Sequence, residues 1–138
     1  IEEYLDYLNH TPTQKNQIIL RITSLPSDTI EITNQIKSLN KHFSPTNFRI
    51  ISDHIHGNST ILCDNVTKPE HMLELIKKIR EKVHQYRGNV ILESVPQNVK
   101  PKCEIWDANT NAIQIMENLK KTYDPLGILN PGRFVGRI

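Results

Sequence analysis

Residues 67–96 read TKPEHMLELIKKIREKVHQYRGNVILESVP. The apolar residues of the first part step by four, three, four and three, at Met72, Ile76, Ile79, Val83 and Tyr86. This spacing places them on one face of an α-helix. Thr67 and Glu70 have the spacing of a capping box, and Pro69 suits a first helical turn. The pattern therefore predicts an amphipathic helix over residues 69–86.

The elements on either side of this helix complete a regular order. Residues 89–95 predict a strand that Pro96 closes, and 17–23 predict a central strand rich in β-branched side chains. Residues 48–55 and 59–63 predict two strands of a hairpin around Gly57-Asn58. The segment 28–42 predicts a helix because four apolar residues share one face: Ile32, Ile36, Leu39 and Phe43.

Strand, helix, strand, strand, helix, strand is the order of the ferredoxin-like βαββαβ unit. Right-handed crossovers would place both helices on one face of a four-stranded antiparallel sheet. A last helix is expected over residues 110–123, followed by an irregular tail. The predicted fold class is therefore α+β, ferredoxin-like, with a C-terminal helix and tail.

The composition is that of a soluble globular protein. The 138 residues are enough for one domain with a core, and the formal net charge of +2 is too balanced to indicate a nucleic-acid partner. Neither a transmembrane segment nor a signal segment is expected. Cys63 and Cys103 are isolated and predict two free thiols in a cytoplasmic protein rather than a disulfide or a metal site.

The C-terminal stretch LKKTYDPLGILNPGRFVGRI, residues 119–138, predicts a helix end and two turns. Pro125 disfavours helical dihedrals at the residue before it, and Asn130-Pro131-Gly132 is a second turn signal. A tail with this chemistry is expected on the surface, where Arg133, Phe134 and Arg137 could meet a partner. The alternative is a strap packed on its own domain.

The ten residues 124–133, DPLGILNPGR, resemble the C-terminal signature of FAD-linked oxidases of the vanillyl-alcohol-oxidase type. With the extension 134–138, the tail looks most like that of the FAD-binding subunit of bacterial glycolate oxidase. The run 90–96, VILESVP, followed after a gap by Trp106, fits the same subunit.

The resemblance implies a part of an oxidase rather than a whole one. Residues 1–16 would be a linker or lead-in helix, 17–96 a ferredoxin-like cap over the reactive face of the flavin, and 97–138 a helix and tail that dock on a flavin-binding domain. That domain is missing from this chain. Asn130, Gly132 and Arg133 would lie at the interface with it.

The expected activity of the intact enzyme is the FAD-dependent oxidation of a small 2-hydroxy acid such as glycolate, with other oxidase subunits as partners. Such subunits could hold a cytoplasmic protein at a membrane surface. The isolated chain is expected to bind no FAD, to be inactive, and to offer its tail to a second copy as a homodimer contact. No catalytic residue is predicted in it.

His54 and His56 would alternate on the predicted strand 48–55 and point to one face, as two ligands of a metal site could. Such a site needs a third ligand, and a solvated hairpin end is the favoured interpretation. In the resembling subunit this turn often reads His-x-Gly-Asn. Here Gly57-Asn58 matches it, but Ile55 replaces the His.

A second hypothesis is a stand-alone ferredoxin-like module for binding, assembly or regulation, without catalysis. The sequence contains no glycine-rich phosphate loop and no complete catalytic set. The coding region upstream of Ile1 discriminates between the two hypotheses: a flavin-binding domain in frame favours the oxidase, and a stop codon with a nearby start favours the module.

Overall fold

The computed structural model describes residues 16–107 and 110–137. The predicted lead-in segment, residues 1–16, lies outside the described residues except at Asn16. The described residues up to Glu104 form one compact unit and those from Ile105 onward a second. The assignment of 17–96 to a cap and 97–138 to a docking segment stays a prediction.

The first unit contains the four strands and two long helices. In chain order its elements are β1 (Ile18–Thr23), the 3-10 turn η1 (Pro26–Asp28), α2 (Thr29–Leu39), β2 (Asn47–Asp53), β3 (Asn58–Asp64), α3 (Pro69–His84), β4 (Asn89–Ser94) and η2 (Lys100–Lys102). The second unit contains α4 (Thr110–Tyr123) and the short turn η3 (Val135–Arg137).

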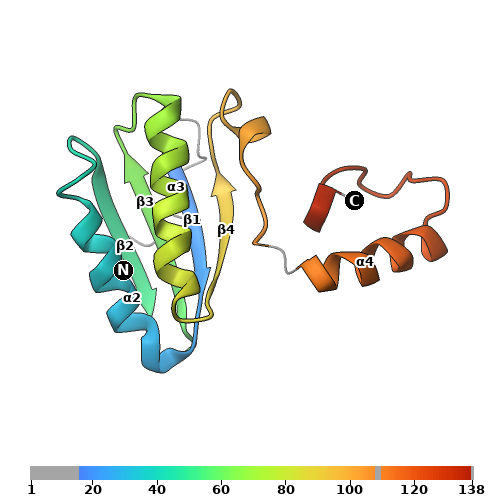
Figure 1. Ribbon diagram of the computed structural model, residues 1–138, viewed down its shortest axis with the longest axis horizontal. Helices are drawn as coiled ribbons and strands as arrows, with labels where there is room; N and C mark the ends of the chain where they lie inside the picture. The colour runs from blue at the N-terminus through green and yellow to red at the C-terminus, as the bar shows by residue number, and fades with distance from the viewer. Residues whose placement is uncertain (1–15, 108–109, 138) are drawn as a thin grey trace. The chain divides into compact units, whose positions relative to one another are not determined.

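The four strands form one sheet in the order β2-β3-β1-β4, and each neighbouring pair is antiparallel. Figure 1 shows α2 and α3 side by side on one face of this sheet. The predicted α+β fold is confirmed, with both helices on the same face of the sheet and a further helix in the C-terminal part of the sequence.

The core lies between the helices and one face of the sheet. Ile18, Leu20 and Ile22 alternate along β1 and are at most 1% exposed, because this face of the pleat turns toward the helices. The buried hydrophobic residues of the two helices are Leu75 and seven members of the predicted stripes: Ile32, Ile36, Leu39, Met72, Ile76, Ile79 and Val83. Phe43 and Tyr86, the other two members, lie beyond the ends of α2 and α3 and are half-buried.

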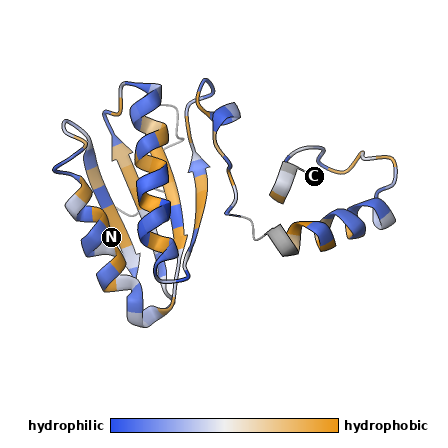
Figure 2. Cartoon of the chain, in the orientation of Figure 1, coloured by the Kyte–Doolittle hydropathy of each residue, from blue (hydrophilic) through white to orange (hydrophobic). Residues whose placement is uncertain are grey.

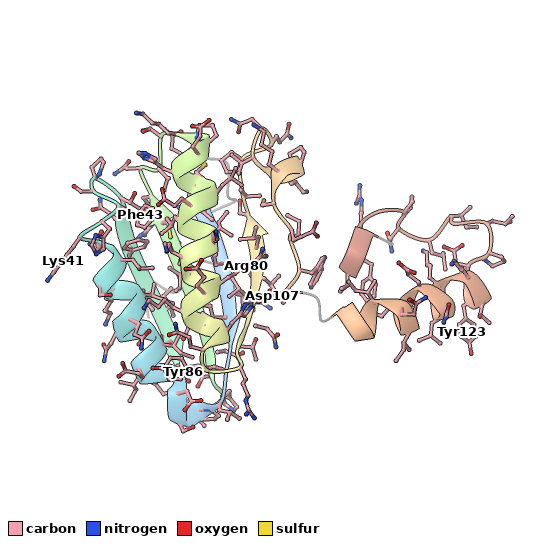
Figure 3. All side chains as sticks on the ribbon, viewed as in Figure 1. Lys41, Phe43, Arg80, Tyr86, Asp107 and Tyr123 are labelled. Carbon is pink, nitrogen blue, oxygen red and sulfur yellow. The ribbon has the colours of Figure 1, made fainter. Side chains whose placement is uncertain are left out.

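The two helices are also joined by a polar contact at one end of α3. Tyr86, which follows α3, accepts a hydrogen bond of 2.7 Å from the side-chain amide of Gln35 in α2. Figure 3 shows Tyr86 at this end of the helix pair. The predicted helix ran to Tyr86, but α3 ends at His84, and the half-buried Tyr86 binds the polar neighbour Gln35 through its hydroxyl.

The predicted capping box at Thr67 and Glu70 is wrong. Lys68 is the N-cap of α3, with extended dihedrals, and no side chain caps this helix end. The physical reason is Pro69, which disfavours helical dihedrals at the residue before it and so fixes the helix start one residue later than a Thr67 cap requires.

The predicted strand 48–55 is too long, and with it the placement of His54 and His56 on a strand is wrong. β2 ends at Asp53, and residues 54–57 form the turn. The carboxylate of Asp53 accepts the backbone N–H of Ile55 at 3.1 Å and of His56 at 3.2 Å, which bends the chain out of the ladder.

The face of the sheet opposite α2 and α3 is mixed, with the buried Ile19 and Leu62 beside charges that are paired across strands. Arg21 on β1 pairs with Glu93 on β4, and Arg49 on β2 pairs with Asp64 on β3 at 3.1 Å. Because each pair joins neighbouring strands, both contribute to strand register, by a few tenths of a kcal/mol.

Candidate docking site at the C-terminal turns

The helix α4 ends at Tyr123, as the sequence predicts. It ends there because Pro125 disfavours helical dihedrals at Asp124. The backbone N–H of Gly127 donates to the carbonyl of Asp124 at 3.0 Å, and Gly127 has a φ of +64°. A residue with a Cβ resists this conformation, so glycine allows the tight reversal.

The carboxylate of Asp124 holds this reversal together. Its two oxygens accept the backbone N–H groups of Ile128 and Leu129, each at 3.0 Å. Lys120, one turn earlier on α4, places its ammonium 2.6 Å from the same carboxylate and also donates to the carbonyl of Leu129. We call Lys120 and Asp124 the clamp, because together they tie the helix end to the tail.

The electrostatics of the clamp favour an ionised carboxylate. The side chain of Asp124 is only 4% exposed, against 25% for Lys120. The hydrogen bond from Lys120 is the main cause that holds the pKa of Asp124 below its ordinary value; the amides of Leu129 and Ile128 act in the same direction, while burial opposes them.

A second turn follows the clamp and contains the three predicted interface residues. Asn130 has a φ of +47° and Gly132 of +69°, and the backbone N–H of Arg133 donates to the carbonyl of Asn130 at 3.2 Å. Asn130, Gly132 and Arg133 are all exposed, and all lie within this one turn. The structure thus agrees with the expectation that the tail is irregular and that Arg133 is accessible.

The second unit also contains the only tryptophan of the chain. The ring of Trp106 lies 6.3 Å from that of Phe134, with an angle of 52° between the ring planes. This is a tilted aromatic pair of the kind that stabilises small clusters. The fluorescence of Trp106 is therefore expected to depend on the position of the tail.

Large apolar side chains are exposed mainly in this second unit. Seven of the ten exposed large hydrophobic residues among the described ones belong to it: Ile115, Leu119, Tyr123, Leu126, Ile128, Leu129 and Phe134. Leu126 and Ile128 are 82% and 72% exposed. Figure 2 shows hydrophobic stretches in the chain that follows α4. Exposed apolar residues grouped in this way mark an interaction surface.

The hairpin end in the first unit offers a different constellation. His56 Nδ1 lies 2.7 Å from the Asp53 carboxylate, and this hydrogen bond is the main cause that lowers the pKa of Asp53. Within the described residues no group of three His, Cys, Asp or Glu side chains is placed to hold a metal ion. The solvated hairpin end is the interpretation that this geometry supports.

The two cysteines are free and buried, as the sequence predicts. Burial is the main cause that raises the pKa of the Cys63 thiol, which keeps it protonated and unreactive. In the part of the chain that the structure describes, no helix has the length and apolar character of a membrane span.

Sequence reasoning did not find the clamp. Lys120 and Asp124 have the i,i+4 spacing of a helical ion pair, and this spacing is a signal that could have drawn attention to them. The contacts of Asp124 with Ile128 and Leu129 had no such signal, because they depend on how the chain folds back after Gly127.

We expect an acid transition in the tail, because the clamp depends on the ionised carboxylate of Asp124. Because the pKa of Asp124 is lower in the folded tail than in the unfolded one, its contribution to stability is complete above the ordinary value of 3.8 and is lost as the pH falls through the folded value. We expect Trp106 fluorescence to stay constant from neutral pH to about pH 4 and to change below it. Asp124→Asn is the control and should lack this transition; a transition of equal size in that variant would contradict the assignment.

The sequence of the second unit matches a known protein family. Residues 105–134 match the sequence profile of the family described as FAD linked oxidases, C-terminal domain. The match covers 30 of the 138 residues, from the segment before α4 to the aromatic partner of Trp106. No match was found among curated proteins. The matched residues support an FAD-linked oxidase C-terminal domain, which implies FAD in the intact enzyme and a flavin-binding domain as partner.

Proposed function

We propose that this chain is the C-terminal, substrate-side cap of an FAD-dependent oxidoreductase of the glycolate oxidase type, which oxidises a small 2-hydroxy acid. The observation that carries the proposal is the family match over residues 105–134, which includes the clamp and the turn with Asn130, Gly132 and Arg133. In this proposal the flavin-binding domain lies in another part of the intact enzyme.

The exposed turns support a docking role for the second unit. The clamp fixes the backbone at Ile128 and Leu129 while their side chains remain 72% and 60% exposed. An ordered loop that displays apolar side chains loses little entropy when it binds. Leu126, Ile128, Leu129 and Phe134 would form the apolar part of the contact and Arg133 its polar rim.

In this proposal the chain lies beside FAD and does not form a complete binding site for it. Two of the grooves formed by described residues of the first unit, of about 430 and 420 Å³, are lined by side chains of α2 and α3 and by residues 42–44 and 102–104. Neither groove is lined by glycine-rich backbone that could hold a pyrophosphate. When bound in the intact enzyme, the flavin would supply the hydride acceptor.

The first unit would then act as the cap. The face of its sheet opposite α2 and α3 carries the Arg21–Glu93 and Arg49–Asp64 pairs, and in this proposal that face is turned toward the partner domain. A cap excludes water from the reacting centre and orients the substrate. Other oxidase subunits and a cytoplasmic location, peripheral to the membrane through those subunits, belong to the same proposal.

The test is the reading frame that contains this chain. We expect a flavin-binding domain in frame upstream of Ile1, and stoichiometric FAD with 2-hydroxy-acid-dependent dye reduction in the purified full-length product. The chain of residues 1–138, mixed with FAD and desalted, should retain no flavin and reduce no dye. A stop codon and a new start directly upstream would instead support the non-catalytic binding module.

The interface residues have their own test, which uses the two parts of that protein expressed separately. Arg133→Ala should weaken the association of the two parts, when they are expressed separately, by about tenfold, the loss typical of an interface arginine. Lys121→Ala is the matched control, because Lys121 is also an exposed cation in the second unit. Equal binding by both variants would remove Arg133 from the interface.

A further inference from the structure

Among the described strands, β2 is an edge strand whose outer backbone groups take part in no strand pairing. The sheet order places it at the outside of the sheet, next to β3 alone, as Figure 1 shows. Within the described part of the chain, β2 pairs with no second strand. An edge of this kind is a template for another strand.

Two of the devices that commonly protect an edge, a proline and a β-bulge, are missing from β2. Its seven residues, NFRIISD, contain neither proline nor lysine, and the register with β3 runs from Asn47 to Asp53 without a bulge. The other edge strand, β4, has a shift in its register with β1. Proteins commonly blunt exposed edges with such features, so the smooth edge of β2 needs an explanation.

The charges along β2 are arranged so that the strand complements itself. Arg49, Ile51 and Asp53 alternate on the face opposite α2 and α3, because Arg49 pairs there with Asp64 and side chains of one face recur every second residue. Arg49 and Asp53 stand at equal distances on either side of Ile51, with opposite charge. Their side chains are 62% and 49% exposed.

We propose that β2 pairs antiparallel with β2 of a second copy of this chain, about a two-fold axis at Ile51, to form a continuous eight-stranded sheet. In this register Arg49 of each copy lies directly opposite Asp53 of the other, and Ile51 lies opposite itself. Cross-strand pairs of opposite charge and pairs of β-branched residues both stabilise a sheet.

The other registers about nearby axes are less favourable. An axis at Arg49 places the two Arg49 side chains opposite each other, and an axis at Asp53 does the same for two carboxylates. Like charges directly opposite destabilise a strand pair. An axis at Ile50 places Arg49 opposite Ile51 and pairs no charges directly. The axis at Ile51 alone among these four aligns two ion pairs.

The first experiment measures the oligomeric state of the full chain by sedimentation velocity over a wide concentration series. We expect a monomer–dimer equilibrium in the wild type. Ile51→Lys should weaken the dimer by at least about tenfold, because two ammonium groups then meet at the axis. The matched control is Ile91→Lys, since Ile91 is half-buried on the same face of the opposite edge strand, and this variant should dimerise like the wild type.

The second experiment tests the register. Residues directly opposite in an antiparallel pair have Cα atoms about 5 Å apart, which is within disulfide range. Ile51→Cys should therefore form a disulfide-linked dimer under mild oxidation. Asn47→Cys, four residues from the axis on the same face, should not, because the two copies of that residue would be about 27 Å apart. The native thiols of Cys63 and Cys103 are buried and give a low background.

Three results would overturn the proposal. A wild-type chain that stays monomeric at every concentration has no such interface. Equal loss of the dimer in Ile51→Lys and Ile91→Lys, or no loss in either, places the contact elsewhere, for example at the exposed tail. Cross-linking of Asn47→Cys but not of Ile51→Cys excludes the axis at Ile51.

Discussion

Gly57→Ala should destabilise the first unit by about 3 kcal/mol, the sum of a positive φ in a residue with a side chain and an overpacked contact. Gly57 has a φ of +70°, and a Cβ there would lie 2.0 Å from the carbonyl oxygen of Ser24. That carbonyl belongs to backbone, and Ser24 also donates its N–H to the carbonyl of Gly57 at 2.8 Å. Neither Ser24, at the end of β1, nor the hairpin turn at Gly57 can move away without losing this hydrogen bond.

Urea denaturation followed by far-UV circular dichroism measures this loss. Gly127→Ala is the matched control, because Gly127 has a similar φ of +64° but a Cβ there would meet nothing within 4 Å. The Gly127→Ala control should lower the free energy of unfolding by about 1 kcal/mol, because of its φ alone, and only for the second unit. If both variants lose the same stability, the clash with Ser24 is not the cause.

Asp124→Ala should release the tail from the helix end. The change removes the acceptor for the amides of Ile128 and Leu129 and the partner of the Lys120 ammonium, all charge-assisted contacts. We expect hydrogen exchange at the Ile128 and Leu129 amides to accelerate at least about tenfold. Trp106 fluorescence should change with it, because Phe134 follows the released turn.

Two further variants make this test specific. Asp124→Asn keeps the shape and one acceptor oxygen but not the charge, so its exchange rates should fall between those of the wild type and Asp124→Ala. Asp53→Ala removes a carboxylate that accepts two backbone amides of the hairpin turn, those of Ile55 and His56. It should accelerate hydrogen exchange at these two amides and leave hydrogen exchange in the tail unchanged. Unchanged exchange at Ile128 and Leu129 in Asp124→Ala would show that the clamp does not hold the tail.

The exposed tail and the open edge of β2 belong to different units of the chain. The proposed function rests on the second unit, where the family match lies, and the proposed dimer rests on β2 of the first unit. The dimer can therefore be wrong without consequence for the oxidase proposal. The reverse also holds, because a non-catalytic module could pair through the same edge.

The sequence by itself determined the kinds and the order of the elements in the described chain. Helical and strand periodicity are local properties, so the stripes at Ile32 and Ile36 and at Met72 and Ile76 indicated which helix faces would be buried. The end of α4 at Tyr123 was equally local, since Pro125 restricts the residue before it. The exposure of Asn130 and Arg133 followed from turn chemistry in the same way.

Only the tertiary structure decided which polar groups meet. The role of Asp124 depends on the chain folding back so that Ile128 and Leu129 present their amides to it. The need for glycine at Gly57 depends on the approach of Ser24 from another strand. The pairs Arg49–Asp64 and Trp106–Phe134 likewise join residues that no local pattern relates. Periodicity is set by neighbours along the chain, whereas these contacts depend on how distant segments are placed in space.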